Sequence, residues 1–420
     1  MTVLIQKAVI VDPTSPHHGK TMDILVDSGM IKAIQPVIEM KADQVVQAKA
    51  LHVSPGWVDV FASFGDPGYE YKETLETGAD AAAAGGFTDV FVVPNTKPVT
   101  DTKSQVNYIK SRSQGLVQVH PIGAISKKTE GHELAEMYDM RSSGAIAFSD
   151  GTHPVQSAGL LVKALQYVRT FDGVIIQIPD DSSIAPHGLM HEGIVSTRIG
   201  LAGKPMMAEE LCVARDIKLA RYAQSKLHFT GVTSPRSLDY IRRAKEAGLS
   251  VTCSVTPYHL FFSDEDLMGY DTNLKVYPPL RTRSHIDALK KALVDGTIDC
   301  IATHHLPHEK DSKVTEFEYA AFGMIGLETC YPALKTAVPD IPETRWVELL
   351  SISPRKIFGL PPATVDIGKP ASLTLFEPDA ITEVNDKFLR SRSRNTPFMD
   401  KQLKGKVKGL INGANKIIIE

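Results

Sequence analysis

The chain has 420 residues, of which 43% are hydrophobic, and its 46 Lys+Arg against 49 Asp+Glu give a formal net charge of -3. This even balance, without a block of like charges, argues against a nucleic-acid-binding surface or a polybasic membrane patch. No segment approaches the roughly 18 uninterrupted apolar residues that a membrane helix needs, and the start of the chain does not resemble an export signal. The four cysteines are scattered, as is typical of reduced thiols, so we expect a cytoplasmic protein without a disulfide framework.

The chain begins with strand-like segments. Residues 3–11 and 23–38 are β-like, and the second segment turns at residues 27–29. This piece is too small to bury a core alone, so it needs a partner from elsewhere in the chain.

The long central part of the chain alternates strand-like and helix-like patterns, which is typical of βα units and a parallel sheet. Two helices are well marked: residues 70–84 are alanine-rich and stop at a Gly-Gly pair, and residues 209–225 have one apolar face. The expected strands cover residues 57–62, 89–94, 116–124, 145–150, 174–179, 227–232, 251–256 and 299–304. Eight strands close a TIM (β/α)8 barrel, which we expect over residues 53–360. An open doubly wound sheet would give the same local signals, but no G-x-G-x-x-G turn follows the first strand.

Two further β-like segments, 371–376 and 407–419, follow a Pro-Pro pair at residues 361–362. We expect them to join the N-terminal strands in a small β-sandwich domain built from both chain ends, residues 1–52 and 361–420. The predicted fold class is therefore α/β, a TIM barrel with an attached β domain.

In a barrel, catalytic side chains come from the C-terminal ends of the strands. A catalytic zinc needs about three ligands among His, Asp, Glu and Cys, with one position open to water. At the expected strand ends only Asp150 and the histidines after the eighth strand are obvious candidates. His304 and His308 are four residues apart and could approach one metal ion if the intervening turn is tight, with His305 as a further weak candidate. The simpler interpretation is that these histidines are polar loop residues at the barrel mouth.

Other kinds of chemistry have less support. The sequence has no G-x-S-x-G elbow and no P-loop, and no cysteine lies at a strand end beside a suitable histidine. A metal-free acid/base pair of Asp150 and His304 stays open, because these residue types titrate in a useful range.

Many short motifs resemble the dihydroorotases of the amidohydrolase superfamily, and the resemblance runs over essentially the whole chain. The matching segments are 55–60 (PGWVDV), 66–68 (DPG), 71–78 (YKETLETG), 85–88 (GGFT), 94–98 (PNTKP), 190–193 (MHEG), 256–260 (TPYHL), 278–281 (PPLR), 295–303 (DGTIDCIAT), 321–323 (AFG), 328–329 (ET) and 395–398 (NTPF). The resemblance implies a zinc-bearing barrel beside a small β domain. It also implies an enzyme of pyrimidine synthesis that opens or closes the cyclic amide of dihydroorotate.

The chain departs from this family at the positions that carry the chemistry. The positions of the family's metal-binding histidines hold Phe61, Ser63, Gln177 and Gly231, and the position of its catalytic aspartate, also a metal ligand, holds His304. The arginine that binds the substrate carboxylate is replaced by Gly65, and a substrate-binding asparagine by Tyr277. We therefore expect no zinc cofactor and no confident catalytic residue.

Three positions keep the family residue. Asp150 matches a metal-bridging aspartate, whereas Asn95 and His308 match substrate-side residues. Asp150, His304 and His308 are thus vestigial catalytic candidates, Asn95 and His308 are candidates for substrate binding, and Asp150, His304 and His305 are weak candidates for a metal site.

Three hypotheses about function follow. The leading one is a catalytically inactive, homo-oligomeric pseudoenzyme that serves as a structural or regulatory subunit for the catalytic chain of aspartate transcarbamoylase. The resemblance suggests this partner, because some bacterial transcarbamoylases assemble with a non-catalytic dihydroorotase-like chain. A second is an active dihydroorotase or other cyclic-amide hydrolase with a rebuilt or metal-free site. The third is a ligand-sensing module that uses the emptied pocket, whose mouth Phe61, Phe64 and Tyr277 would make more apolar. None of the three involves nucleic acid or a membrane.

Overall fold

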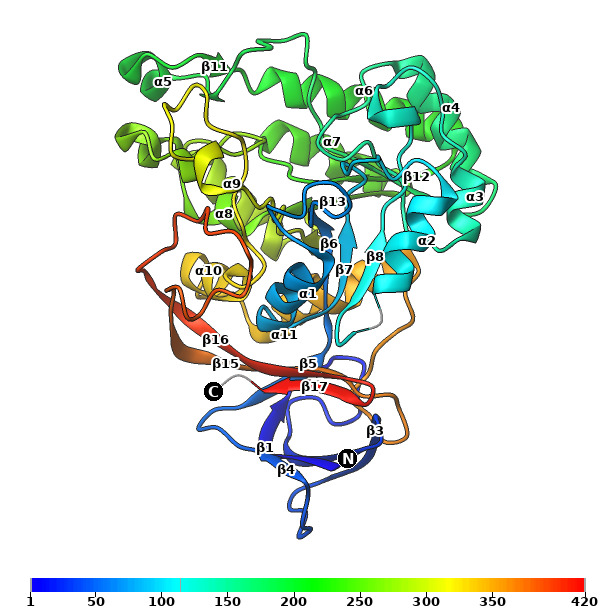
Figure 1. Cartoon of the computed structure of the whole chain (residues 1–420), viewed down its shortest axis with the longest axis vertical. Coiled ribbons are helices and arrows are strands. Elements are labelled where there is room, and N and C mark those ends of the chain that lie inside the picture. Colours follow the sequence, from blue (N-terminus) through cyan, green and yellow to red (C-terminus); the bar gives the residue numbers. More distant parts are fainter. Residues whose placement is uncertain (1, 114, 419–420) are drawn as a thin grey trace.

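The computed structural model describes residues 2–113 and 115–418, and it has a barrel of parallel strands above a β-sheet domain (Figure 1). The barrel strands are β6 (Trp57–Ala62), β7 (Phe87–Val92), β8 (Gln118–Pro121), β9 (Val174–Gln177), β12 (Lys226–Phe229), β13 (Val251–Val255) and β14 (Cys300–Ile301). They pair in parallel in the orders β6-β7-β8 and β9-β12-β13-β14.

Two sets of isolated parallel bridges join these sheets. Phe148 bridges Gly123 on one side and Ile175 on the other, and Ala62 bridges His305. The first set carries the strand order from β8 to β9, and the second returns it from β14 to β6. The TIM-barrel fold predicted from the sequence is therefore confirmed, although residues 145–150 contribute a single bridging residue rather than the regular strand that was expected.

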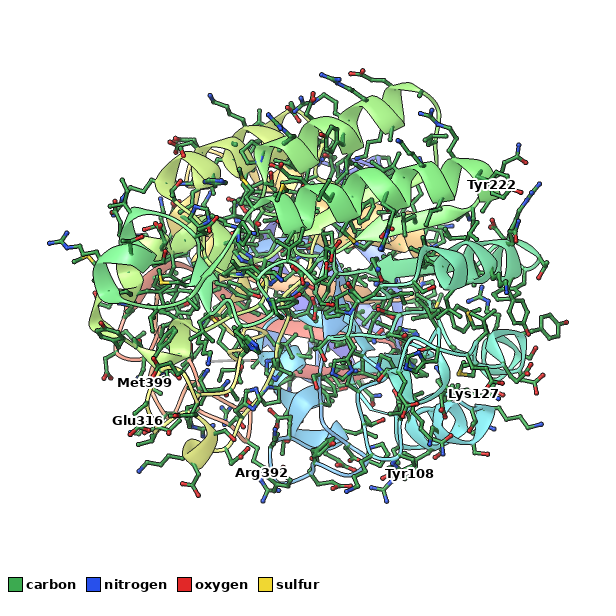
Figure 2. The ribbon with its side chains drawn as sticks, turned by 90° about the horizontal axis from the view of Figure 1, so that it is seen from above. Tyr108, Lys127, Tyr222, Glu316, Arg392 and Met399 are labelled. Carbon is green, nitrogen blue, oxygen red and sulfur yellow. The ribbon has the colours of Figure 1, made fainter. Side chains whose placement is uncertain are left out.

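Helices surround these strands on the outside of the barrel. Viewed from above, α6 runs along the outer surface and Tyr222 projects from it into solvent (Figure 2). The helices are α1 (Leu75–Ala84), α2 (Lys103–Arg112), α3 (Met137–Ser142), α4 (Ala158–Arg169), α5 (Ile194–Ile199), α6 (Met207–Ala223), α7 (Pro235–Glu246), α8 (Pro257–Phe261), α9 (Arg283–Val294), α10 (Cys330–Ala337), α11 (Glu343–Val347) and α12 (Ser353–Phe358). A two-stranded ribbon of β10 (Met190–His191) and β11 (Gly203–Lys204) flanks α5. Within the part of the chain that the structure describes, no helix is long and apolar enough to cross a membrane.

Helix α1 begins five residues later than the sequence pattern predicted. The Thr74 side chain accepts a hydrogen bond from the Thr77 amide and so caps the helix, which leaves residues 70–74 in the preceding turns. The helix stops at Gly85, and Gly86 has a φ of 86°, a value that glycine adopts without strain. This later start leaves Lys72 and Glu73 in a loop that faces the barrel mouth.

Both ends of the chain contribute to the β domain. Its sheet has the order β17-β16-β15-β5-β1-β2-β3, with β4 paired to β1. The strands are β1 (Thr2–Ile10), β2 (Thr21–Asp27), β3 (Met30–Gln35), β4 (Gln44–Val46), β5 (His52–Pro55), β15 (Ser372–Glu383), β16 (Gln402–Asn412) and β17 (Asn415–Ile418). The expected sandwich is thus one hydrogen-bonded sheet around its own apolar core. The last expected strand ran to Ile419, which lies outside the described residues.

Aromatic packing joins the sheet to the barrel. The buried indole of Trp57 on β6 lies 5.5 Å from the ring of Phe376 on β15 and 5.1 Å from that of Tyr331 on α10. Thr374 on β15 adds a hydrogen bond of 2.7 Å from its hydroxyl to the carbonyl of Gly86, beside β7. The expected boundary near residue 52 falls within β5, which pairs with both β1 and β15. The exact division into domains remains a prediction.

Candidate functional site

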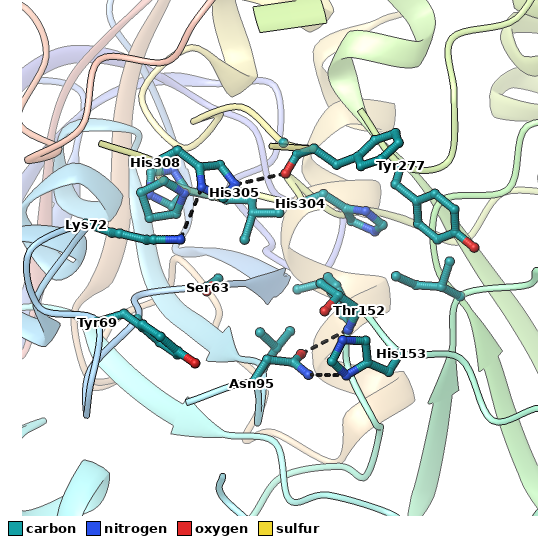
Figure 3. A pocket seen from close by; sticks show the side chains of 18 of the residues that line it. Ser63, Tyr69, Lys72, Asn95, Thr152, His153, Tyr277, His304, His305 and His308 are labelled. Carbon is teal, nitrogen blue, oxygen red and sulfur yellow. Dashed lines mark hydrogen bonds between the residues drawn. The ribbon is translucent and has the colours of Figure 1, made fainter. Parts of the chain in front are cut away.

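A cavity of about 420 Å³ opens at the C-terminal ends of the barrel strands (Figure 3). Such a position is where a TIM barrel normally builds its active site. Nine of its nineteen lining residues are aromatic residues or histidines, and no aspartate or glutamate is among them: Phe61, Ser63, Gly65, Tyr69, Lys72, Val93, Asn95, Thr152, His153, Ile178, Tyr258, Tyr277, His304, His305, Leu306, Pro307, His308, Phe322 and Gly323.

An aromatic ring occupies the position that the resemblance assigns to the first metal-binding histidine. Phe61 is 3% exposed at the end of β6, and its ring centroid lies 4.6 Å from that of His304. Ser63 follows two residues later and also lines the cavity. Its amide donates a 2.7 Å hydrogen bond to the carbonyl of His305, which fixes the end of the first strand against the last.

His304 points into the space next to Gly231. Its Nε2 lies 2.7 Å from Thr230 Oγ1, and a Cβ placed on Gly231 would stand only 2.8 Å from His304 Cε1. Burial lowers the pKa of His304 to about 3, with nearby His259 adding to the effect, so the imidazole is neutral near pH 7. The His304 side chain therefore fills the space beside Gly231. The resemblance assigns metal ligands to both of these positions.

Gln177, at a third metal position, holds a neighbouring loop. Its Nε2 donates to the Val155 carbonyl at 3.1 Å, and its Oε1 accepts from the Val155 amide at 3.3 Å. Both ends of this buried amide are thereby committed to the backbone.

Asp150 keeps the family residue, but its carboxylate binds a neighbouring loop. Its Oδ1 accepts from the amides of Ile125 and Ser126, each at 2.9 Å, and its Oδ2 accepts from the Ser126 hydroxyl at 2.5 Å. Burial raises the pKa of Asp150 to about 6, although these hydrogen bonds oppose the rise. The carboxylate holds the loop after β8 and is not part of the cavity lining.

His305 faces a buried glutamate. Its Nδ1 accepts from the Gly326 amide at 3.2 Å, so Nε2 carries the proton and lies 3.5 Å from Glu73 Oε2. Burial opposes ionisation of Glu73, but His305 and the hydroxyls of Ser391 and Thr77 outweigh it and lower its pKa. Glu73 also accepts from the Arg392 amide at 2.9 Å, so the pair pins the segment around residues 391–393 to the barrel.

His308 is fixed from both ring nitrogens. Nε2 donates to the Phe322 carbonyl at 2.9 Å, and Nδ1 lies 3.3 Å from the Lys72 ammonium (Figure 3). Since the lysine can only donate, Nδ1 is the acceptor. Burial lowers the pKa of His308 to about 4, and the charge of Lys72 adds to this, so His308 is neutral near pH 7.

Asn95 lies on the opposite wall of the cavity. Its Nδ2 donates to the Asp150 carbonyl at 3.1 Å, and its Oδ1 accepts from the Thr152 amide at 2.9 Å. Asn95 and His308 both line the cavity, as the sequence prediction of a substrate-side pair requires, but their role in binding stays a prediction.

The side chains at the positions that the resemblance assigns to zinc ligands do not fit a zinc ion. Phe61 and Gly231 offer no donor atom, Gln177 is bonded to Val155, and Asp150 is bonded to Ser126. Among residues 2–113 and 115–418, no group of three or more His, Cys, Asp or Glu side chains is arranged to hold a metal ion. The alternative site expected from Asp150, His304, His305 and His308 is not assembled either, because these four side chains face different partners.

Two details differ from the sequence-based expectation of an apolar mouth. Phe61 and Tyr277 line the cavity as expected, but Phe64 was assigned wrongly: it is 2% exposed and packs beside Gly78 and His305. Lys72 was named only within the matching segment 71–78 and not as a site residue, but it lines the cavity. The signal that could have marked it is that Lys72 precedes the Thr74 helix cap and therefore lies in a rim loop.

Comparisons with known proteins agree with the fold and with the motifs. A family model described as "Dihydro-orotase-like" matches residues 51–237. The chain is 41% identical over 411 residues to a dihydroorotase of Pelotomaculum thermopropionicum, covering 96% of both chains, and 40% identical to one of Acetivibrio thermocellus, covering 100% of this chain and 99% of the relative.

Similar solved structures include an L-hydantoinase (dihydropyrimidinase) from Arthrobacter aurescens, with a TM-score of 0.87, 24% identity and coverage of 99% of this chain and 96% of the other. A dihydropyrimidinase from Brevibacillus agri has a TM-score of 0.83 at 19% identity, with coverage of 100% and 95%. These likenesses support the fold, and the full-length identity to the curated relatives decides the family. The chain belongs to the dihydroorotase family.

Proposed function

We propose that this chain does not hydrolyse dihydroorotate and serves instead as a non-catalytic subunit that assembles with the catalytic chain of aspartate transcarbamoylase. The observation that carries the first half is the replacement of the zinc donor set by Phe61, Gln177 and Gly231, with His304 packed into the vacated space. A dihydroorotase-like role in pyrimidine biosynthesis fits both halves of the proposal.

The chemical argument concerns the attacking water. A bound zinc would lower the pKa of its water to about 7 and would so supply hydroxide at neutral pH. A replacement would need a base aimed at the cavity. His304 is bonded to Thr230, and the Asp150 carboxylate is bonded to Ser126 and Ile125 outside the cavity lining. The side chains of Asp150 and His304 therefore do not face each other as a metal-free acid/base pair would need.

The partner is proposed from the family resemblance. Some bacterial transcarbamoylases assemble with a non-catalytic dihydroorotase-like chain, and a protein whose barrel is retained while its site is altered suits that role. The proposal includes self-association and a cytoplasmic location, both of which such an assembly would need.

The test is co-expression of this chain, tagged, with the untagged aspartate transcarbamoylase catalytic chain of the same organism. We expect the two to co-purify and to elute from a sizing column as one species whose mass exceeds that of either alone. The control is an intact dihydroorotase from an organism in which dihydroorotase and aspartate transcarbamoylase do not assemble. Separate elution of the two chains at all mixing ratios would contradict the partner and leave the question of catalysis to the activity assay.

A further inference from the structure

The outward face of α6 carries apolar side chains where a barrel helix normally carries polar ones. Met207 is 52% exposed and Leu211 is 50% exposed, and the half-buried Ala214 continues the same stripe. The spacing i, i+4, i+7 places these three residues on one face of the helix. The stripe is separate from the buried face that packs on the barrel, and α6 itself lies on the outer surface of the molecule (Figure 2).

This stripe borders a hollow of about 490 Å³ on the outside of the barrel. The hollow is lined by residues of α6, of α7 and of the segment from β10 to Glu192: His191, Glu192, Met206, Met207, Glu210, Leu211, Ala214, Arg236 and Tyr240. Ile194, the first residue of α5, is 87% exposed and lies at an adjoining hollow that shares Glu192. Exposed apolar side chains therefore gather around one end of α6, and a gathering of this kind marks an interaction site.

The charges of α6 are divided between its two sides. Its three carboxylates are buried and bonded within the protein: Glu209, Glu210 and Asp216. The exposed charged side chains of its second half are basic, Lys218 and Arg221, and the exposed Arg236 of α7 lines the hollow. In the part of the chain that the structure describes, none of these three cations has an ion pair or a hydrogen bond from its side chain. The outward face is thus apolar at one end and basic at the other.

A buried donor in the hollow also lacks an acceptor. Nδ1 of His191 accepts a hydrogen bond from the Arg281 guanidinium at 3.1 Å, so Nε2 carries the proton. His191 is 8% exposed, and within residues 2–113 and 115–418 its Nε2 has no hydrogen-bond partner. Burial, with the charge of Arg281, lowers the pKa of His191 to about 3, so the ring is neutral near pH 7. Buried donors are normally paired, and a neutral acceptor from another molecule would complete this one.

We propose that this face of α6 and α7 docks an acidic amphipathic helix of another protein. The helix runs antiparallel to α6: carboxylates in its first turns pair with Lys218 and Arg221, and its apolar second half fills the hollow. Its free C-terminal carbonyls then meet the Nε2–H of His191 and the charge of Arg236. The segment from Met207 to Arg221 is about 20 Å long, so one short helix reaches both ends.

The charges favour a protein helix over a nucleic acid or a lipid surface. Glu192 and Glu210 line the hollow, and their carboxylates repel a phosphate placed there. A helix avoids this repulsion because its own carboxylates lie at the other end of the face, and its apolar anchors follow the spacing that grooves between helices accept. The inference rests on the composition of this face and does not depend on the partner proposed above.

The experiment titrates the full chain into two dye-labelled probe peptides and follows fluorescence anisotropy. Each is an alanine-based peptide of about 16 residues, held helical by a hydrocarbon staple, with leucines on one face of its second half. One carries three glutamates on the same face of its first half, and the other carries three lysines there. We expect the glutamate peptide to bind roughly tenfold or more tightly than the lysine peptide, and added salt to weaken it.

Two variants of the chain test the two ends of the face. Leu211→Glu places a charge in the apolar stripe and should weaken the glutamate peptide roughly tenfold or more. The double variant Lys218→Glu, Arg221→Glu should abolish the preference for the glutamate peptide. All three residues are exposed, so the melting temperature of each variant should match that of the unaltered chain.

Matched controls lie outside the face. Val294→Glu changes an apolar residue of α9 that is 71% exposed, and the double variant Lys32→Glu, Lys41→Glu changes the net charge equally through two exposed lysines of the β domain. Both should bind the glutamate peptide like the unaltered chain.

Equal affinity for the two peptides, unaltered binding by Leu211→Glu, or no binding up to about millimolar chain would each overturn the proposal. So would a dimer of the chain alone that Leu211→Glu abolishes, since a second copy would then cover the face. Binding to phosphatidylserine vesicles that is lost in Lys218→Glu, Arg221→Glu would likewise overturn it and assign the face to a lipid surface.

Discussion

The contact between Gly231 and His304 predicts a specific energetic coupling. In Gly231→Ala, the new Cβ meets His304 Cε1 at 2.8 Å, well inside the 3.5–4.0 Å at which carbon atoms attract. His304 cannot retreat easily, because Phe61 packs against its ring and Thr230 binds its Nε2. The φ of 73° adds the left-handed penalty of about 1–2 kcal/mol, and overpacking adds about 1–3 kcal/mol. We expect a total loss of about 2–5 kcal/mol in the free energy of unfolding.

A matched control separates the two contributions. Gly200 also has a φ of 73°, but a Cβ there would meet nothing within 4 Å, so Gly200→Ala should cost only the backbone part. Removing the imidazole with His304→Ala should bring the cost of Gly231→Ala down toward that of Gly200→Ala, apart from a smaller contact with Pro278 Cδ at 3.2 Å.

The assay is urea unfolding of the unaltered chain, of Gly231→Ala, Gly200→Ala and His304→Ala, and of the double variant Gly231→Ala, His304→Ala. Unfolding is followed by circular dichroism and analysed by linear extrapolation. The double-mutant cycle should give a coupling energy of about 1–3 kcal/mol. If Gly231→Ala costs no more than Gly200→Ala, or if the coupling is below about 0.5 kcal/mol, then His304 does not occupy the space beside Gly231 and the reasoning fails.

Three further predictions concern other contacts of the site. Gln177→Ala should lower the free energy of unfolding by about 1–3 kcal/mol, because the Val155 amide and carbonyl lose their buried partner; a loss below about 0.5 kcal/mol in urea titrations would refute this. The pKa of His304 is about 3 in the folded chain and near 6.5 when unfolded, so the unfolded state gains a proton as the pH falls below 6.5. The unaltered chain should therefore lose about 1.4 kcal/mol more per pH unit than His304→Gln between pH 6 and 4, and parallel stability curves would count against a buried neutral imidazole. Glu73→Gln should speed hydrogen exchange at the Arg392 amide while the barrel strands stay protected, and unchanged exchange there would show that this carboxylate does not hold the segment.

The sequence predicted the barrel well because its signals are local. Strand β6 has the expected bounds, 57–62, and the glycine stop after α1 lies where it was expected. Residues 145–150 failed as a regular strand, since only Phe148 meets both neighbours in register. The start of α1 was missed because Thr74 rather than a residue near 70 caps the helix, and periodicity alone does not distinguish a turn from a first helical turn.

The site was predictable in composition and less so in geometry. The residues at the family's metal positions could be read from the motifs, and these include Phe61 and Gln177. That Asp150 would turn to Ser126 depends on a loop 24 residues earlier in the chain, which no local pattern specifies. His304 adopts a φ of 47°, uncommon for a residue with a side chain, and only the emptied position 231 explains where its ring lies.

We propose that the strand ends of this barrel do not support the hydrolysis for which the family is named. The most direct measurement is the interconversion of dihydroorotate and carbamoyl aspartate by the purified chain with zinc added, with an intact dihydroorotase assayed in parallel. We expect a rate at background for this chain under conditions in which the control is active. Turnover above background that disappears in the double variant His304→Ala, His308→Ala would contradict the account and place a working site at the end of the last strand.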